Sequence, residues 1–178
     1  YDVRGRLIAS ITADRQTVFS YDAGGNLASM TDPTGRRTSY EHDAIGRLTA
    51  VKRPDGSGVS YDYDVNGNMR LLVTPAEVAH EFDFNRVNLK SSYRTPLGGS
   101  YQYRYDRDRR PTETLLPSGR IIRHVYDRGL LVRTETSEGA VSFGYLCGGN
   151  VGSITRGGEG LSFTYDGSLL ISETVNGV

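Results

Sequence analysis

Several residue types are scarce in this chain of 178 residues, and each scarcity excludes a class of explanation. A single cysteine, Cys147, cannot form an internal disulfide, so no disulfide framework holds the fold. Lys and Arg together number 21, as do Asp and Glu. This zero net charge argues against nucleic acid or an anionic membrane as the main partner, because both attract basic surfaces. No apolar run approaches the roughly 20 residues of a membrane-spanning helix.

What the sequence does contain is a tyrosine-aspartate pair that returns about every 21 residues. The complete copies are Tyr1-Asp2, Tyr21-Asp22, Tyr63-Asp64, Tyr105-Asp106, Tyr126-Asp127 and Tyr165-Asp166, and the degenerate ones are His42-Asp43, Phe84-Asn85 and Tyr145-Leu146. A fixed period of this kind indicates a repeat architecture. About nine repeats fill residues 1–178, and both ends fall on repeat boundaries, so we interpret the chain as one repeat region cut from a longer protein.

The residues before each pair alternate in polarity. Val59, Tyr61 and Tyr63 occupy every second position, while Gln102 and Arg104 are typical of the positions between such residues. Strict alternation rich in β-branched and aromatic residues is typical of a half-buried β-strand. We therefore predict an aromatic face and a polar face on every such strand.

A tight turn is predicted directly after each pair. The aspartate can accept backbone N–H groups across the turn, and the fourth position carries a residue that tolerates positive φ, such as Asn88 in one degenerate copy. An apolar residue then starts the return strand. The predicted motif residues are Tyr1, Asp2, Gly5, Leu7, Tyr21, Asp22, Gly25, Leu27, Asp43, Gly46, Leu48, Tyr63, Asp64, Gly67, Phe84, Tyr105, Asp106, Tyr126, Asp127, Tyr145, Gly149, Tyr165 and Asp166.

A second turn is predicted about twelve residues after each aromatic. Proline followed by glycine two residues later is a strong turn signal. The residues of this second turn are Pro33, Gly35, Pro54, Gly56, Pro75, Pro96, Gly98, Pro117 and Gly119. Repeats without the proline still supply Glu138-Gly139, Gly157-Gly158 and Asn176-Gly177.

The predicted fold is all-β: consecutive antiparallel hairpins of about 21 residues each, without helices. Nine repeats correspond to on the order of 17 strands in one meander. Such a wide sheet is expected to curl, so we predict a curved strip of a hollow, solenoid-like shell. We also expect the aromatic residues of neighbouring repeats to stack laterally.

The motif Tyr-Asp-x-x-Gly-Arg/Asn-Leu, seen in residues 1–7 and 21–27, resembles the YD repeat of the Rhs family over the whole chain. Relatives include bacterial polymorphic toxins, the shell-forming B and C components of insecticidal toxin complexes, and animal teneurins. The resemblance implies a strip of hairpins that spirals into a hollow shell. It implies that bacterial relatives enclose a C-terminal toxic domain, whereas teneurins display a similar shell at the cell surface for adhesion.

Some repeats depart from this pattern. Arg109 and Pro111 occupy the glycine and leucine positions of one repeat, which makes the turn over 107–111 the least regular. The repeats at Tyr126 and Tyr165 are one residue short, for which we expect a changed turn and not a broken strand. In toxin-bearing relatives, Asp-Pro-x-Gly motifs near the end of the shell are linked to self-cleavage. Because Asp32 lies at the ordinary second-turn position, we interpret it as a turn residue.

No catalytic constellation stands out. Gly-x-Ser-x-Gly, phosphate-binding, His-Glu-x-x-His and cysteine-cluster motifs are absent from the sequence. His42, His80 and His124 fall two repeats apart, roughly 19 Å, so we interpret them as replacements of aromatic residues and not as ligands of one metal. We interpret Cys147 as a packed or loop thiol. The charged residues between the aromatics indicate a solvated face with cross-strand ion pairs.

These observations predict a structural protein: a wall segment of a YD-repeat shell that encapsulates a C-terminal toxin or effector domain of a large secreted bacterial protein. The expected partners are the rest of the shell and the enclosed domain, and no cofactor, metal, nucleic acid or membrane span is expected. A secreted or cell-surface location follows, bacterial in preference to animal because no Asn-x-Ser/Thr site occurs. The alternative is an adhesive or carbohydrate-binding shell, with surface proteins or glycans as partners. An enzyme active within this segment is a third class.

Overall fold

The computed structural model describes residues 1–176, so Gly177 of the last predicted turn lies outside the described residues. Within them, seventeen strands form one antiparallel sheet, and no helix occurs, which confirms the predicted fold class and number of strands. The strands are β1 (Ala9–Thr12), β2 (Arg15–Tyr21), β3 (Leu27–Thr31), β4 (Arg37–His42), β5 (Leu48–Lys52), β6 (Gly58–Tyr63), β7 (Met69–Val73), β8 (Ala79–Phe84), β9 (Lys90–Arg94), β10 (Ser100–Tyr105), β11 (Pro111–Leu115), β12 (Ile121–Asp127), β13 (Leu130–Thr136), β14 (Gly139–Tyr145), β15 (Val151–Arg156), β16 (Glu159–Asp166) and β17 (Leu169–Asn176).

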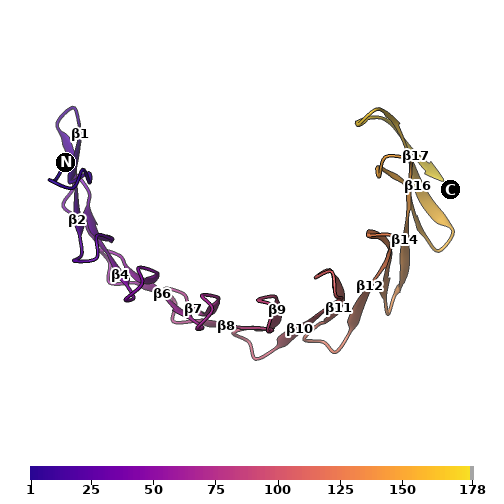
Figure 1. The fold of residues 1–178 in the computed structure, drawn as a ribbon, viewed down its shortest axis with the longest axis horizontal. Coiled ribbons are helices and arrows are strands. Elements are labelled where there is room, and N and C mark those ends of the chain that lie inside the picture. Colours follow the sequence, from indigo (N-terminus) through magenta and orange to yellow (C-terminus); the bar gives the residue numbers. More distant parts are fainter. Residues whose placement is uncertain (177–178) are drawn as a thin grey trace. The chain divides into compact units, whose positions relative to one another are not determined.

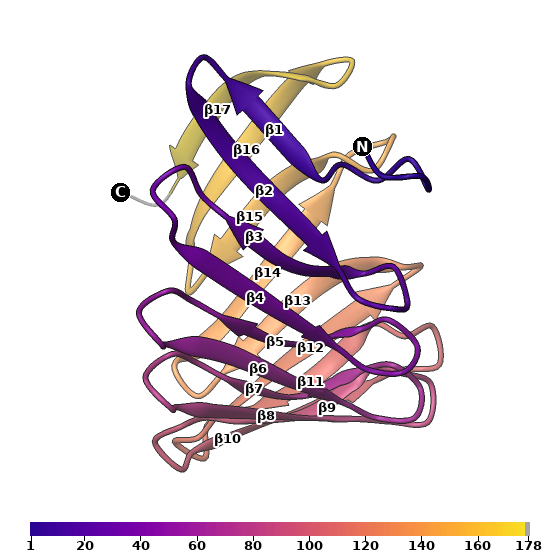
Figure 2. The same ribbon diagram turned by 90° about the vertical axis from the view of Figure 1, so that its left-hand side faces the viewer.

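The chain divides into two compact units. The first comprises Tyr1–Asn88 with Arg94–Leu97, and the second comprises Leu89–Tyr93 with the chain from Gly98 onward. Within each unit the strands follow one another in chain order (Figures 1 and 2). Consecutive strands pair from β1–β2 to β7–β8 in the first unit and from β10–β11 to β16–β17 in the second.

Each unit is a single layer of strands. Exposure alternates along β8 and β10 as the sequence pattern predicts, with the aromatic positions half-buried and most of the positions between them exposed. In residues 1–176 no apolar side chain is buried, and Ser29 is the one buried polar residue, at 5% exposure. The sheet therefore lacks a hydrophobic core of its own. Its stability has to come from contacts between neighbouring strands within the layer.

The expected lateral stacking of aromatics is wrong for most repeats. Register places Leu72 opposite Tyr61 and Ile154 opposite Phe143, so aliphatic residues of the return strands separate successive aromatic strands. Two strand spacings amount to about 9.6 Å, which exceeds the 4.5–7 Å at which rings interact. An exception arises where the return strand itself carries an aromatic: the rings of Tyr93 and Tyr101 stack with centroids 5.8 Å apart.

A β-bulge lies beside the repeat aromatic in most repeats, and the sequence pattern does not predict it. Tyr63 pairs with Met69, but Asp62 pairs with Leu71, so Arg70 is the extra residue. A bulge bends the strand and increases its local twist. Equivalent shifts fall at Ser20/Tyr21, Glu41/His42, Arg104/Tyr105, Val125/Tyr126, Gly144/Tyr145 and Thr164/Tyr165.

The two turns of the repeat are built alike. In the first turn, Asp22 N–H donates to the Asn26 carbonyl, and Gly25 N–H donates back to the Asp22 carbonyl. The glycine position needs positive φ, and Gly25 has φ 93°. The second turn repeats this geometry at Asp32, whose carbonyl accepts Gly35 N–H.

The irregular repeats keep their hairpins. Arg109 adopts φ 66° in an ordinary first turn. In the shortened repeat, Arg128 and Gly129 have φ values of 47° and 89° in a two-residue hairpin, as expected for a type I′ turn. This confirms a changed turn without a broken strand.

The second turns allow the backbone cost of positive φ to be isolated. Gly35 has φ 83°, and no atom lies within 4 Å of the place that a Cβ atom would occupy there. Gly35→Ala should therefore lower the free energy of unfolding by about 1 kcal/mol through backbone strain alone. Chemical denaturation of the purified protein measures this. Glu77 holds the equivalent position at φ 58°, so Glu77→Gly should not destabilise the protein. An unchanged stability in Gly35→Ala would contradict the account.

Candidate functional site

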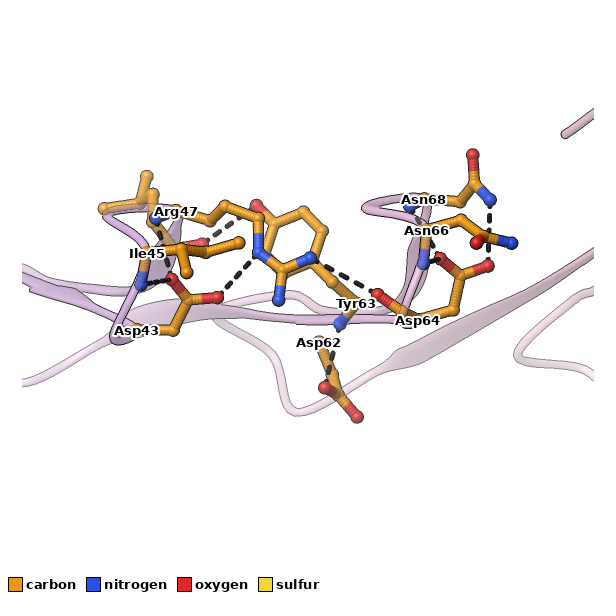
Figure 3. Close-up of polar contacts among 9 residues, drawn as sticks. Asp43, Ile45, Arg47, Asp62, Tyr63, Asp64, Asn66 and Asn68 are labelled. Atoms are coloured by element: carbon orange, nitrogen blue, oxygen red, sulfur yellow. Dashed lines mark hydrogen bonds and ion pairs between the residues drawn. The ribbon is translucent and has the colours of Figure 1, made fainter.

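The aspartate of the YD pair organises the first turn. The Asp43 Oδ1 atom accepts the backbone N–H groups of Ile45 and Arg47 at 3.0 and 2.9 Å. Its Oδ2 atom accepts Arg47 Nε at 2.6 Å. One carboxylate thus holds two backbone groups and one side chain (Figure 3).

The same arrangement recurs with either arginine or asparagine five residues after the aromatic. Asp2 holds Arg6 Nε at 2.7 Å, and Asp64 holds Asn68 Nδ2 at 2.8 Å. Asp106 holds Arg110 Nε at 2.7 Å. This explains why an N–H-bearing side chain follows the glycine in the motif.

The tyrosine hydroxyl reaches back to the preceding repeat. Tyr63 Oη donates to the Leu48 carbonyl at 2.9 Å. The β5–β6 ladder ends at Ala50 and Ser60, so this bond joins the two strands beyond the last paired residues. We call it the clasp: a hydroxyl of one repeat tyrosine bonded to a carbonyl at the start of the preceding return strand. It recurs in the pairs Tyr21–Leu7, Tyr105–Lys90, Tyr126–Pro111, Tyr145–Leu131 and Tyr165–Val151.

The arginine of one repeat also covers the tyrosine of the next. The Arg47 Cζ atom lies 4.6 Å from the Tyr63 ring centroid, and Arg47 Nη1 donates to the Asp64 carbonyl at 3.3 Å (Figure 3). Arg6 lies over Tyr21 at 4.5 Å. Such cation–π contacts contribute about 0.5–1 kcal/mol at partly exposed sites. The aspartate therefore orients the arginine of its own repeat, and this arginine contacts the tyrosine of the next repeat. We call this chain of contacts from one repeat to the next the relay.

Asp32 resembles the other turn aspartates. Its carboxylate accepts the backbone N–H and hydroxyl of Thr34 and the N–H and Nε of Arg36. The Thr34 hydroxyl is the largest cause of a lowered pKa at Asp32, with Arg36 adding to it. A carboxylate occupied in this way is a turn cap, and its surroundings match its interpretation as a turn residue.

An open groove lies beside two successive second turns of the first unit. Its volume is about 650 Å³. The lining residues are Met30, Asp32, Arg36, Thr38, Val51, Arg53, Pro54 and Asp55. Two arginines face two aspartates there, and Arg36 is paired with Asp32 at 2.8 Å, so the groove carries no net charge that would select a ligand.

The remaining candidates are dispersed. His42 Nδ1 lies 3.7 Å from Asp22 Oδ2, and His124 Nδ1 lies 3.2 Å from Thr134 Oγ1. Within residues 1–176, no cluster of His, Cys, Asp or Glu has the composition of a metal site, and no helix could span a membrane. Cys147 is exposed in a first turn.

Cross-strand ion pairs cover the non-aromatic face, as the sequence pattern predicted. Lys52 pairs with Glu41 at 2.6 Å, and Arg70 pairs with Asp62. In the second unit, Glu113 forms ion pairs with Arg104 and Arg123. Both partners of the first two pairs are well exposed, so each contributes little to stability.

Sequence reasoning found the tyrosine, aspartate and glycine positions but missed the relay. Arg6, Arg47 and Arg110 belong to the motif, yet its period alone assigns no contact to them. A signal was present, because these three arginines each precede a repeat whose aromatic is tyrosine. Asn26 and Asn68 precede His42 and Phe84 instead.

Comparison with known proteins agrees with a fold built of YD repeats. The Teneurin YD-shell family model matches residues 1–177, and no curated protein matches the chain. Among solved structures, the crystal structure of TcdB2-TccC3 without its hypervariable C-terminal region is similar at a TM-score of 0.58 and 12% identity, over 97% of this chain and 13% of that one. The Photorhabdus luminescens Tc holotoxin pore gives the same four values. At this identity the likeness shows the fold alone, and the chain spans 13% of the length of either structure.

The clasp can be tested by removing one hydroxyl. Tyr63→Phe leaves the Leu48 carbonyl without its donor and should lower the free energy of unfolding by about 0.5–1.5 kcal/mol. The matched control is Tyr61→Phe on the same strand, because the Tyr61 hydroxyl has no hydrogen-bond partner within residues 1–176. Equal effects of the two substitutions on denaturant unfolding would rule out the clasp as a stabilising contact.

Acid should weaken the first turns. The backbone N–H of Arg47 lowers the pKa of Asp43 most, and the Arg47 side chain and Ile45 N–H add to this against an opposing effect of burial. The Asn68 amide does the same for the pKa of Asp64. A depressed folded-state pKa contributes stability that is complete above the unfolded value of 3.8 and is lost as the pH falls through the folded value.

Stability measured by denaturant unfolding should therefore decline as the pH is lowered below about 4. Asp43→Asn should make this decline shallower, because one of the responsible carboxylates is gone. A variant whose decline is as steep as that of the parent protein would show that the capping aspartates do not cause it.

Proposed function

Because the chain belongs to the Teneurin YD-shell family, we propose that it is a structural segment in the wall of a YD-repeat shell. The observation that carries this proposal is a layer one strand thick, with no apolar side chain fully buried in residues 1–176. A separate globular domain would need a core. A wall needs repeats that bind their neighbours, and the relay supplies such contacts.

We further propose that the complete shell encloses a C-terminal toxin or effector domain of a secreted or surface-delivered protein. The fold likeness to TcdB2-TccC3 structures, one of which is described as lacking a hypervariable C-terminal region, supports this proposal. In it, the partners of this segment are the remainder of its shell and the enclosed domain. Confinement behind a hydrogen-bonded wall would protect the producing cell until delivery.

A non-enzymatic role is part of the same proposal. The aspartates of the motif are engaged in turns, as Asp43 and Asp32 illustrate. Among the tyrosines, Tyr21 and Tyr63 lie beneath arginines and use their hydroxyls in clasps. Rings covered in this way are poorly placed to stack on sugars, which weighs against a carbohydrate-binding surface.

The test uses the full-length native protein purified under mild conditions. A denaturing gel should show a cleaved C-terminal piece that co-purifies with the shell and resists added protease until the shell is unfolded. An intact chain with nothing protected inside would refute encapsulation and leave an adhesive shell as the leading function.

A variant that damages the wall sharpens the experiment. Gly46 has φ 85°, and a Cβ there would lie 3.1 Å from Asn26 Oδ1, so Gly46→Val should open this turn and expose the enclosed piece to protease. The matched control is Val65→Ala at a fully exposed turn position, which should leave the protection unchanged. If Gly46→Val protects as well as the control, this segment is not part of the protecting wall.

A further inference from the structure

In the first unit, the hairpins β3–β4, β5–β6 and β7–β8 are closed by second turns and have short ladders. In β5–β6 the paired residues run from Lys52↔Gly58 to Ala50↔Ser60. The ladders of β3–β4 and β7–β8 are also three pairs long, ending at Ser29↔Ser39 and Leu71↔Glu81. The ends of these hairpins nearest the first turns therefore depend on side-chain contacts.

The clasp supplies this contact in β5–β6. Tyr63 Oη holds the Leu48 carbonyl at 2.9 Å, and Arg47 reinforces the joint by covering the ring and donating to the Asp64 carbonyl. The hydroxyl bond is fixed at 2.8–2.9 Å in all six hairpins that possess it. Such uniform geometry indicates a standard way of closing the hairpin.

The hairpin β3–β4 lacks this closure. His42 occupies the tyrosine position, and its Nδ1 atom is buried without a hydrogen-bond partner. The nearest opposite charge is Asp22 Oδ2 at 3.7 Å, a carboxylate already engaged by the Asn26 amide at 3.1 Å. A buried nitrogen without a hydrogen-bond partner lowers the stability of this hairpin, whereas the clasp raises the stability of β5–β6.

The hairpin β7–β8 lacks the closure for a simpler reason. Phe84 occupies the tyrosine position and has no hydroxyl to donate. Asn68 replaces the arginine and donates to Asn88 Oδ1 at 3.0 Å, a contact between exposed amides of the two first turns. Asparagine alone does not prevent a clasp, because Asn150 precedes Tyr165, whose hydroxyl still reaches the Val151 carbonyl. The aromatic position therefore decides which hairpins are clasped.

We propose that β3–β4 and β7–β8 are the weak joints of this wall, at which the first-turn ends of the strands separate before those of the clasped hairpins. Both joints lie in the first compact unit, on either side of the clasped hairpin β5–β6. A wall whose backbone repeats uniformly thus has predetermined places of local opening. This inference concerns the wall itself and does not depend on what the shell encloses.

Hydrogen exchange of the full-length protein, followed by mass spectrometry, tests the proposal. Local opening sets the exchange rate of an amide. Amides of the last ladder pairs at the weak joints, Ser29 with Ser39 and Leu71 with Glu81, should exchange about ten-fold faster than those of the equivalent pair, Ala50 with Ser60. Equal or slower exchange at the weak joints would overturn the proposal.

Reciprocal substitutions locate the cause. Phe84→Tyr supplies a hydroxyl at the position equivalent to Tyr63, where the Met69 carbonyl corresponds to that of Leu48, and should slow exchange at Leu71 and Glu81. Tyr63→Phe should bring Ala50 and Ser60 to the rate of the weak joints, while Tyr61→Phe should leave them unchanged. If neither Phe84→Tyr nor Tyr63→Phe changes the exchange rates, the clasp does not control opening of the hairpins. Protection of a C-terminal piece from protease is a separate readout, so failure of either proposal can be recognised without the other.

Discussion

A sheet one layer thick cannot bury its own side chains, and this constraint governs the rest of the structure. Ser29, at 5% exposure, is the single buried residue in the described part of the chain. Apolar burial, which dominates the stability of ordinary domains, is therefore limited to half-buried rows such as Tyr40 opposite Val51. Cohesion along the sheet must come from ladders, turns and side-chain bonds between neighbouring repeats.

The YD motif meets this need with few residues. The Asp43 carboxylate fixes the turn by accepting the backbone N–H groups of Ile45 and Arg47 at Oδ1, and it orients the Arg47 side chain by accepting Nε at Oδ2. Arg47 then covers Tyr63, whose hydroxyl returns to the Leu48 carbonyl beside the first turn. The cation–π contact is worth about 0.5–1 kcal/mol and the hydroxyl bond about 0.5–1.5 kcal/mol by itself. Because the three share the same side chains, ordering one of them lowers the entropic cost of forming the others.

Periodicity was sufficient to predict the strands, the turns and the family resemblance. Alternation identifies which residues share a face, and positive φ explains Gly25 and Gly35 in their turns. Periodicity does not show which residues of the return strand lie between two aromatic strands. Lateral stacking of aromatics was therefore expected at places where Leu72 and Ile154 separate the rings. The bulge at Arg70 was likewise hidden, because one extra residue in a return strand leaves the 21-residue period unchanged.

The contacts that periodicity could not predict are also those that distinguish one repeat from another. The backbone of β3–β4 is paired like that of β5–β6, with three register pairs in each. Only β5–β6 has the clasp, because Tyr63 follows Arg47 there, whereas His42 follows Asn26 in β3–β4. In a globular domain, a close-packed common core would transmit the effect of such substitutions to many neighbours. This sheet has no core through which the loss of a contact could be shared. The stability of each hairpin is therefore set by the side chains that bond across it. A change of residue within the motif changes how easily that hairpin opens.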